Sequence, residues 1–234
     1  MAATSAHMVT TLGLDSAGNA CSAAVWRGDH VVARRFAAME RGHAETLMPM
    51  VAAVMEEAAL AIAALDLIAV TTGPGAFTGV RIGIAAARGL SLASGVPALG
   101  IASFAAAAAQ APREERRGRP LLVALDSRRA EFFVQMFGVD DVPLAPGAML
   151  LPTELAPRLP KEPLLVAGDA AAALAAALGR ADLAVASRAG AIDAGDVARL
   201  AAAAWRPGWR PPPPAPLYLR APDTTLPREK ASGP

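Results

Sequence analysis

The 234-residue sequence has one cysteine, three histidines and few aromatic side chains, which make up 4% of the chain. A single cysteine, Cys21, excludes an internal disulfide framework and fits a reducing compartment. Neither sign of charge is in clear excess, because 22 basic and 21 acidic residues give a net charge of +1. The chain is therefore not expected to bind nucleic acid through bulk electrostatic attraction.

Metal-ligand patterns and targeting signals are missing as well. The three histidines are scattered, and no two of them lie four residues apart, so no metal site is expected. The start of the chain lacks the basic and apolar regions of a signal peptide. The longest uncharged run, residues 89–112, contains glycines and prolines that predict a turn between elements instead of a membrane span. We expect a cytoplasmic protein without a membrane segment.

Two similar segments divide the chain. Residues 12–16 (LGLDS) and 122–127 (LVALDS) read as strands that end in Asp-Ser, 111 residues apart, and each precedes a second apolar stretch. The pattern predicts a duplicated α/β unit with an N-terminal lobe at 8–112 and a C-terminal lobe at 120–220. Residues 221–234 are expected to form a flexible tail.

Turns after the predicted strands are candidate phosphate loops, since backbone N–H groups in such turns can surround a phosphate. One turn follows the first strand, and a glycine-rich loop at 73–79 lies between a strand and a helix. The turn at 126–130 has no glycine, and ordinary hairpin and helix-entry turns are the favoured alternative throughout. The candidate phosphate-loop residues are Asp15, Ser16, Gly18, Gly73 and Gly75.

Two predicted helices, at 44–60 and 79–93, are candidates for a partner interface. The first is apolar around most of its circumference, so we expect its own sheet on one side and a partner on the other. Methionines that fill gaps in the core are the alternative. The candidate interface residues are Leu47, Met50, Val51, Val54, Gly79, Arg81, Gly83, Ala87 and Arg88.

Small residues recur at every fourth position of the second predicted helix, at Gly79, Gly83 and Ala87. Such a row lets a neighbouring backbone come close. We expect the row to face a partner, and the alternative is that it faces the sheet of its own lobe.

Several segments together resemble the TsaB family, also called YeaZ. They are TTGPGAFTGVRIGIAAARGL at 71–90, LGLDSAGNACSAAVW at 12–26, HAETLMPMV at 43–51, LVALDSRRAEFFVQMF at 122–137 and PLYLR at 216–220. The resemblance implies an actin/Hsp70-like (ASKHA) fold of two ribonuclease-H-like lobes with mixed sheets. It also implies a non-catalytic subunit in the synthesis of tRNA N6-threonylcarbamoyladenosine.

The resemblance further implies partners. TsaB proteins pair through the first two helices with TsaD, the catalytic paralogue, and TsaE, an ATPase, joins the pair. The positions that match the metal-binding His-x-x-x-His motif of TsaD carry Ser103 and Ala107 here. We therefore expect no cofactor, no catalytic residue, contact with tRNA only through the complex, and a homodimer when the chain is alone.

Two other classes of function remain open. A nucleotide-binding kinase of the same fold is disfavoured by the glycine-free turn at 126–130. A glycoprotease-like metallopeptidase would need metal ligands that three scattered histidines do not supply.

Overall fold

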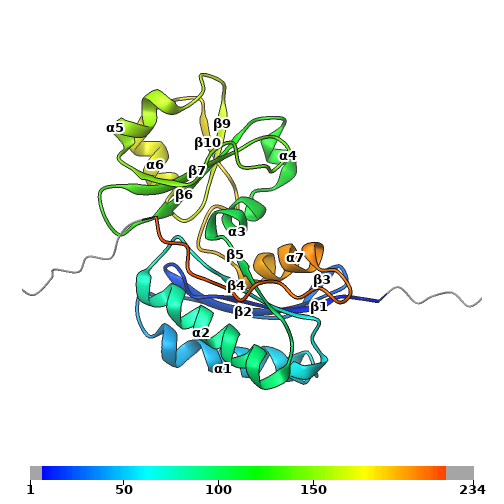
Figure 1. Ribbon diagram of the computed structural model, residues 1–234. Helices are drawn as coiled ribbons and strands as arrows, with labels where there is room; N and C mark the ends of the chain where they lie inside the picture. Colours follow the sequence, from blue (N-terminus) through cyan, green and yellow to red (C-terminus); the bar gives the residue numbers. More distant parts are fainter. Residues whose placement is uncertain (1–6, 220–234) are drawn as a thin grey trace, which may run out of the picture.

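Two five-stranded sheets, one from each half of the chain, organise the computed structural model, which describes residues 7–219 (Figure 1). In the first half the elements are β1 (Thr10–Asp15), β2 (Ala20–Arg27), β3 (His30–Ala38), α1 (His43–Glu57), a 3-10 turn (Ile62–Ala64), β4 (Leu67–Thr71), α2 (Phe77–Ser94), β5 (Ala98–Ile101) and α3 (Ser103–Gln110). In the second half they are α4 (Arg113–Arg116), β6 (Leu121–Asp126), β7 (Phe132–Phe137), β8 (Ala148–Leu150), α5 (Pro152–Leu155), a 3-10 turn (Ala156–Arg158), β9 (Leu164–Ala167), α6 (Ala171–Leu178), β10 (Leu183–Val185) and α7 (Ala194–Ala204).

Both sheets have the same topology. The first has the order β3-β2-β1-β4-β5, and the second, read in the matching direction, has the order β8-β7-β6-β9-β10. In each, three strands form an antiparallel meander and two further strands join in parallel beside its first strand. This repeated order is the duplicated ribonuclease-H-like arrangement of actin/Hsp70-like proteins. The predicted duplication and fold class are confirmed.

The two halves exchange a helix across the middle of the molecule. Helix α7, from the second half, packs against β1, β2 and β4 of the first sheet, whereas α3, from the first half, packs against β6, β7 and β9 of the second. Their apolar side chains share one core cluster between the sheets, while α1 and α2 cover the opposite face of the first sheet (Figure 1). A contiguous C-terminal lobe at 120–220 therefore does not describe α7, which covers the first sheet.

Sequence and structure agree closely on the two long helices. The ranges expected, 44–60 and 79–93, correspond to α1 at His43–Glu57 and α2 at Phe77–Ser94. Helix α2 ends at Gly95, whose φ of 76° is a common helix terminator because glycine adopts the left-handed region without strain. No helix within residues 7–219 is long and apolar enough to cross a membrane. The tail predicted at 221–234 lies outside the described residues.

Candidate functional site

Asp15, at the end of β1, is completely buried beside the start of α2. Its Oδ1 accepts hydrogen bonds from the Thr71 hydroxyl at 2.6 Å and from the Ala17 N–H at 3.4 Å, whereas Oδ2 has no partner in the described part of the chain. Burial raises the pKa of this carboxyl to about 7, with a further increase from the charges of Asp169 and Asp193, against the lowering effect of the two hydrogen bonds. Asp15 is therefore partly protonated near neutral pH.

The first turn packs directly onto the N-terminal end of α2. The Ala17 carbonyl accepts a hydrogen bond from the Ala76 N–H at 2.7 Å, and the Ser16 hydroxyl donates to the Gly79 carbonyl at 2.9 Å. A Cβ atom on Gly75 would lie 2.3 Å from the Ala17 carbonyl oxygen, and one on Gly79 would lie 2.1 Å from that of Ser16. These glycines are thus required for contact between two segments of the chain itself, which favours the structural alternative for the candidate phosphate loops.

The two remaining candidates in these loops are also engaged within the chain. Gly73 has a φ of 101°, and a Cβ atom there would lie 2.8 Å from the Leu217 carbonyl oxygen. A Cβ atom on Gly18 would lie 3.5 Å from Asp169 Oδ2. Gly73 is needed for its backbone conformation, whereas Gly18 marks where the first turn approaches the second half.

The turns that follow β1 and β6 meet each other between the halves. The Asn19 side chain donates to Asp126 Oδ2 at 3.2 Å and accepts from the Arg128 guanidinium at 2.9 Å. Asp169, largely buried next to them, accepts from the Asp126 N–H at 3.0 Å, and burial raises the pKa of its carboxyl. Side chains therefore bridge the space between the two repeated turns.

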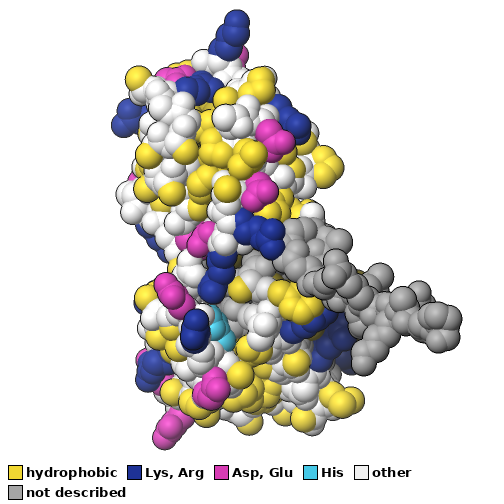
Figure 2. Space-filling view, turned by 90° about the vertical axis from the view of Figure 1, so that its left-hand side faces the viewer, with side chains coloured by type: hydrophobic (Ala, Val, Ile, Leu, Met, Phe, Trp, Pro, Cys, Tyr) yellow, Lys and Arg dark blue, Asp and Glu magenta, His cyan; other side chains and the backbone are white. Residues whose placement is uncertain are grey.

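A cleft of about 850 Å³ opens beside these turns. Its walls come from the N-terminal ends of α1 and α2, the turn after β6 and residues 217–219, and basic side chains lie at the waist between the lobes on this face (Figure 2). His43, the first residue of α1, lines the cleft; it is mostly buried, and its Nε2 lacks a hydrogen-bond partner among residues 7–219. The cleft thus adjoins the two helices that the sequence singled out.

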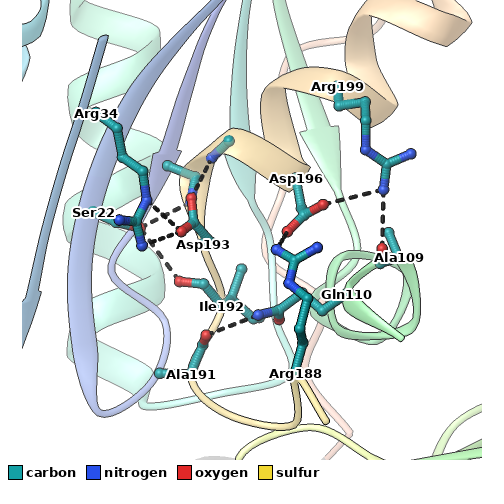
Figure 3. A network of polar contacts seen from close by, with 12 residues as sticks. Ser22, Arg34, Ala109, Gln110, Arg188, Ala191, Ile192, Asp193, Asp196 and Arg199 are labelled. Carbon is teal, nitrogen blue, oxygen red and sulfur yellow. Dashed lines mark hydrogen bonds and ion pairs between the residues drawn. The ribbon is translucent and has the colours of Figure 1, made fainter. Parts of the chain in front are cut away.

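A polar network around the N-terminal end of α7 holds this helix against the first sheet (Figure 3). Asp193 caps the helix by accepting from the Gly195 N–H at 2.8 Å, and it also pairs with Arg34 of β3. Asp196, in the first turn of α7, is bound by Arg188 at 3.0 Å and by Arg199 at 3.1 Å. The Arg34–Asp193 ion pair and a hydrogen bond from Arg199 to the Ala109 carbonyl at 3.0 Å join the two halves of the chain.

Six of the nine candidate interface residues belong to the chain's own core. They share burial against the first sheet, and they are Leu47, Val51, Val54, Gly79, Gly83 and Ala87. A Cβ atom on Gly83 would lie 2.8 Å from Ser16 Oγ and 3.1 Å from Val70 Cγ2. The expectation that the small-residue row faces a partner is therefore wrong, because the row lets α2 lie close to β1 and β4.

The other three candidates are not fully buried. Met50 of α1 is half-buried against the same core, whereas Arg81 and Arg88 lie on the solvent-exposed side of α2. Large apolar side chains that the sequence analysis did not select lie on this side, with Met48 44%, Phe77 43% and Leu92 89% exposed. We define the outer face as the exposed positions of α1 and α2. These are Ala44, Glu45, Met48, Pro49, Ala52, Glu56, Glu57, Phe77, Thr78, Arg81, Ala85, Arg88, Gly89, Leu92 and Ala93.

Ser103 and Ala107 are both fully buried in α3, within the layer between the two sheets. The Ser103 hydroxyl has no hydrogen-bond partner in the described part of the chain, while its N–H donates to the Gly73 carbonyl at 2.8 Å. Across residues 7–219, no three side chains of His, Cys, Asp or Glu come together in a way that could hold a metal ion.

Comparison with known proteins identifies the family within the actin/Hsp70-like class. The solved structure of YeaZ from Pseudomonas aeruginosa is 30% identical, with a TM-score of 0.77, and the match covers 91% of this chain and 100% of that one. The tRNA threonylcarbamoyladenosine biosynthesis protein TsaB of Escherichia coli (strain K12) is 35% identical over 122 residues. The chain belongs to the TsaB (YeaZ) family, as its motifs indicated.

Part of the chain, from β3 of the first half to β7 of the second, also matches the transferase family. The family model for TsaD, the tRNA N6-adenosine threonylcarbamoyltransferase, matches residues 34–143. The enzyme of that name from Dinoroseobacter shibae is 41% identical over 110 residues, or 40% of this chain and 30% of the enzyme. Alignments with the curated TsaB relatives span about half of each protein, 52% of both chains for that of E. coli.

Proposed function

We propose that this chain is a non-catalytic subunit in the biosynthesis of tRNA N6-threonylcarbamoyladenosine, and that it acts by pairing with a TsaD-like transferase. The observation that carries the proposal is the outer face of α1 and α2, where large apolar side chains are exposed in a member of the TsaB family. Exposed apolar side chains grouped on one surface are typical of protein interaction sites. The transferase itself would supply the catalytic groups, a TsaE-like ATPase would join the pair, and tRNA would be bound through the complex.

The shared segment supports a partner of related structure. Residues 34–143 match the TsaD family model and include α1 and α2. Two chains with the same pair of helices can associate face to face in the manner of a two-fold dimer. The same geometry would allow a homodimer when the transferase is absent.

The test is reconstitution with the TsaD-like subunit from the same organism. The wild-type chain should bind this subunit and support tRNA modification only in its presence, when threonylcarbamoyl-adenylate and a TsaE-like ATPase are supplied. Met48→Glu places a charge on the outer face and should weaken binding by about tenfold or more.

The matched control is Val185→Glu, on β10 of the second sheet, because Val185 is 43% exposed and Met48 is 44% exposed. This variant should bind the transferase like the wild type. Modification by the chain in the rigorously confirmed absence of the transferase, or equal binding by both variants, would contradict the proposal.

A further inference from the structure

The described C-terminal segment, residues 206–219, lies against the first half after α7 ends. It runs back along the edge of the first sheet toward the N-terminal end of α2 (Figure 1). The Leu217 N–H donates to the Thr72 carbonyl at 2.7 Å, and the Pro214 carbonyl accepts from the Arg88 guanidinium at 2.9 Å. These two bonds hold Tyr218 beside the first turn of α2.

Tyr218 and Phe77 form a stacked aromatic pair at the rim of the outer face. Their ring centroids are 5.5 Å apart with an interplanar angle of 28°, and the two rings are 41% and 43% exposed. The guanidinium carbon of Arg81 lies 3.5 Å from the centroid of Phe77 and 5.6 Å from that of Tyr218. Cation–π contact with both rings therefore restricts the orientation of this guanidinium.

The guanidinium of Arg81 has no hydrogen bond or ion pair within residues 7–219, although the side chain is exposed and held in position. This distinguishes it from Arg88, which binds the Pro214 carbonyl, and from the arginines around α7, which pair with aspartates. Five N–H donors in a rigid fork suit a carboxylate, which can accept two parallel hydrogen bonds. A positioned arginine next to exposed aromatic rings is also the composition typical of an interface hot spot.

We propose that Arg81, held by Phe77 and Tyr218, binds a carboxylate of the TsaD-like subunit, so that the C-terminal segment forms part of the docking surface. The inference rests on the proposed function. It extends that surface beyond the two helices, since Tyr218 comes from the other end of the chain. A partner that covers the outer face would bury Arg81, and a buried guanidinium needs an opposite charge to offset its lost hydration.

The experiment measures the dissociation constant for the transferase subunit with the full chain, at two or more salt concentrations. Arg81→Ala should weaken binding by about tenfold and reduce the dependence of affinity on salt. Arg81→Lys should restore only part of the affinity, because an ammonium group lacks the planar fork. Tyr218→Ala should weaken binding by several-fold, with the melting temperature unchanged, because the guanidinium loses one of its two aromatic contacts.

Arg206→Ala is the matched control, since Arg206 is exposed and lies just after α7, away from the outer face. It should bind like the wild type. Wild-type affinity for Arg81→Ala, while Met48→Glu loses binding, would overturn the inference and leave the proposed function intact. Normal assembly of Arg81→Ala with impaired tRNA binding would overturn it too, by assigning the arginine to a phosphate. Undiminished binding by Met48→Glu would contradict the docking face itself, and the inference with it.

Discussion

The two sides of α2 have opposite roles although both are rich in small and apolar residues. On the inner side, Gly79 and Gly83 lie so close to the turn after β1 that an added Cβ atom would approach Ser16 within 2.1 and 2.8 Å. On the outer side, Gly89 has no atom within 4 Å of such a Cβ, and Leu92 is 89% exposed. The inner side therefore maintains the fold, and the outer side is available to a partner. The same type of substitution should therefore affect folding on the inner side of α2 and partner binding on the outer side.

The largest effect is expected from Gly83→Arg. The substitution forces a long charged side chain between α2 and the first sheet, where Val70 and Ser16 leave no space. An unpaired charge and overpacking at one buried site should lower the free energy of unfolding by more than about 4 kcal/mol, so the first half should fail to fold. Thermal unfolding followed by circular dichroism measures this.

Ala85→Arg is the comparison for that variant, because Ala85 is exposed two residues farther along the same helix. Its free energy of unfolding should lie within about 0.5 kcal/mol of the wild-type value. The variant should nevertheless lose affinity for the TsaD-like subunit. A Gly83→Arg protein that melts like the wild type would show that the inner side is not packed as described.

Gly79→Ala should have the next largest effect. Its methyl group would overlap the Ser16 carbonyl oxygen, and either the first turn or the start of α2 must move. Overpacking of this kind costs about 1–3 kcal/mol, partly offset by the better helix propensity of alanine. Urea unfolding gives the change directly, and a variant at least as stable as the wild type would contradict the close approach.

The buried carboxyl of Asp15, at the start of the first turn, should make stability depend on pH. Because its pKa is raised to about 7 in the folded chain, from 3.8 for the unperturbed group, the folded state binds the proton more tightly than the unfolded state does. The stability associated with the protonated carboxyl should therefore be present at about pH 4 and be lost as pH rises to about 7, with a slope of up to about 1.4 kcal/mol per pH unit.

Asp15→Asn should remove this part of the pH dependence, which urea unfolding at several pH values between 4 and 8 would reveal. The comparison is of slopes, so it holds even when the substitution changes stability at every pH. Parallel curves for the two proteins would mean that Asp15 is ionised throughout.

The smallest effect is expected from Gly89→Ala on the outer side. Because the added methyl group would contact no other atom, the change in stability should come from helix propensity alone, which favours alanine by about 1 kcal/mol. The melting temperature should rise slightly. A loss of stability equal to that of Gly79→Ala would remove the distinction between the two sides.

Much of the architecture could be predicted from local patterns. The repeated strand that ends in Asp-Ser predicted the duplication, and two equivalent sheets confirm it. The ends of α1 and α2 were predicted to within three residues because glycine and apolar spacing mark them. The exchange of α3 and α7 was not predicted, since the partner of a helix in the core depends on contacts between residues far apart in the sequence.

Most of the candidate interface residues lie on the buried side of their helices. In α1 the buried residues Leu47, Val51 and Val54 and the exposed Met48 are all apolar, so hydrophobic periodicity does not distinguish one side from the other. The contacts of Tyr218 with Phe77 and Arg81 were also missed. A contact between residues 77 and 218 has no signal in either local sequence.

The sequence by itself determined the family, the α/β duplication and the positions of the long helices, because each depends on motifs or periodicities within short segments. Only the tertiary structure decided which side of each helix is buried, which turns are closed by the chain itself, and where Arg81 is held. The physical reason is that these features depend on approach distances between distant segments. At Gly79 and Gly83, these distances leave no room for one additional carbon atom.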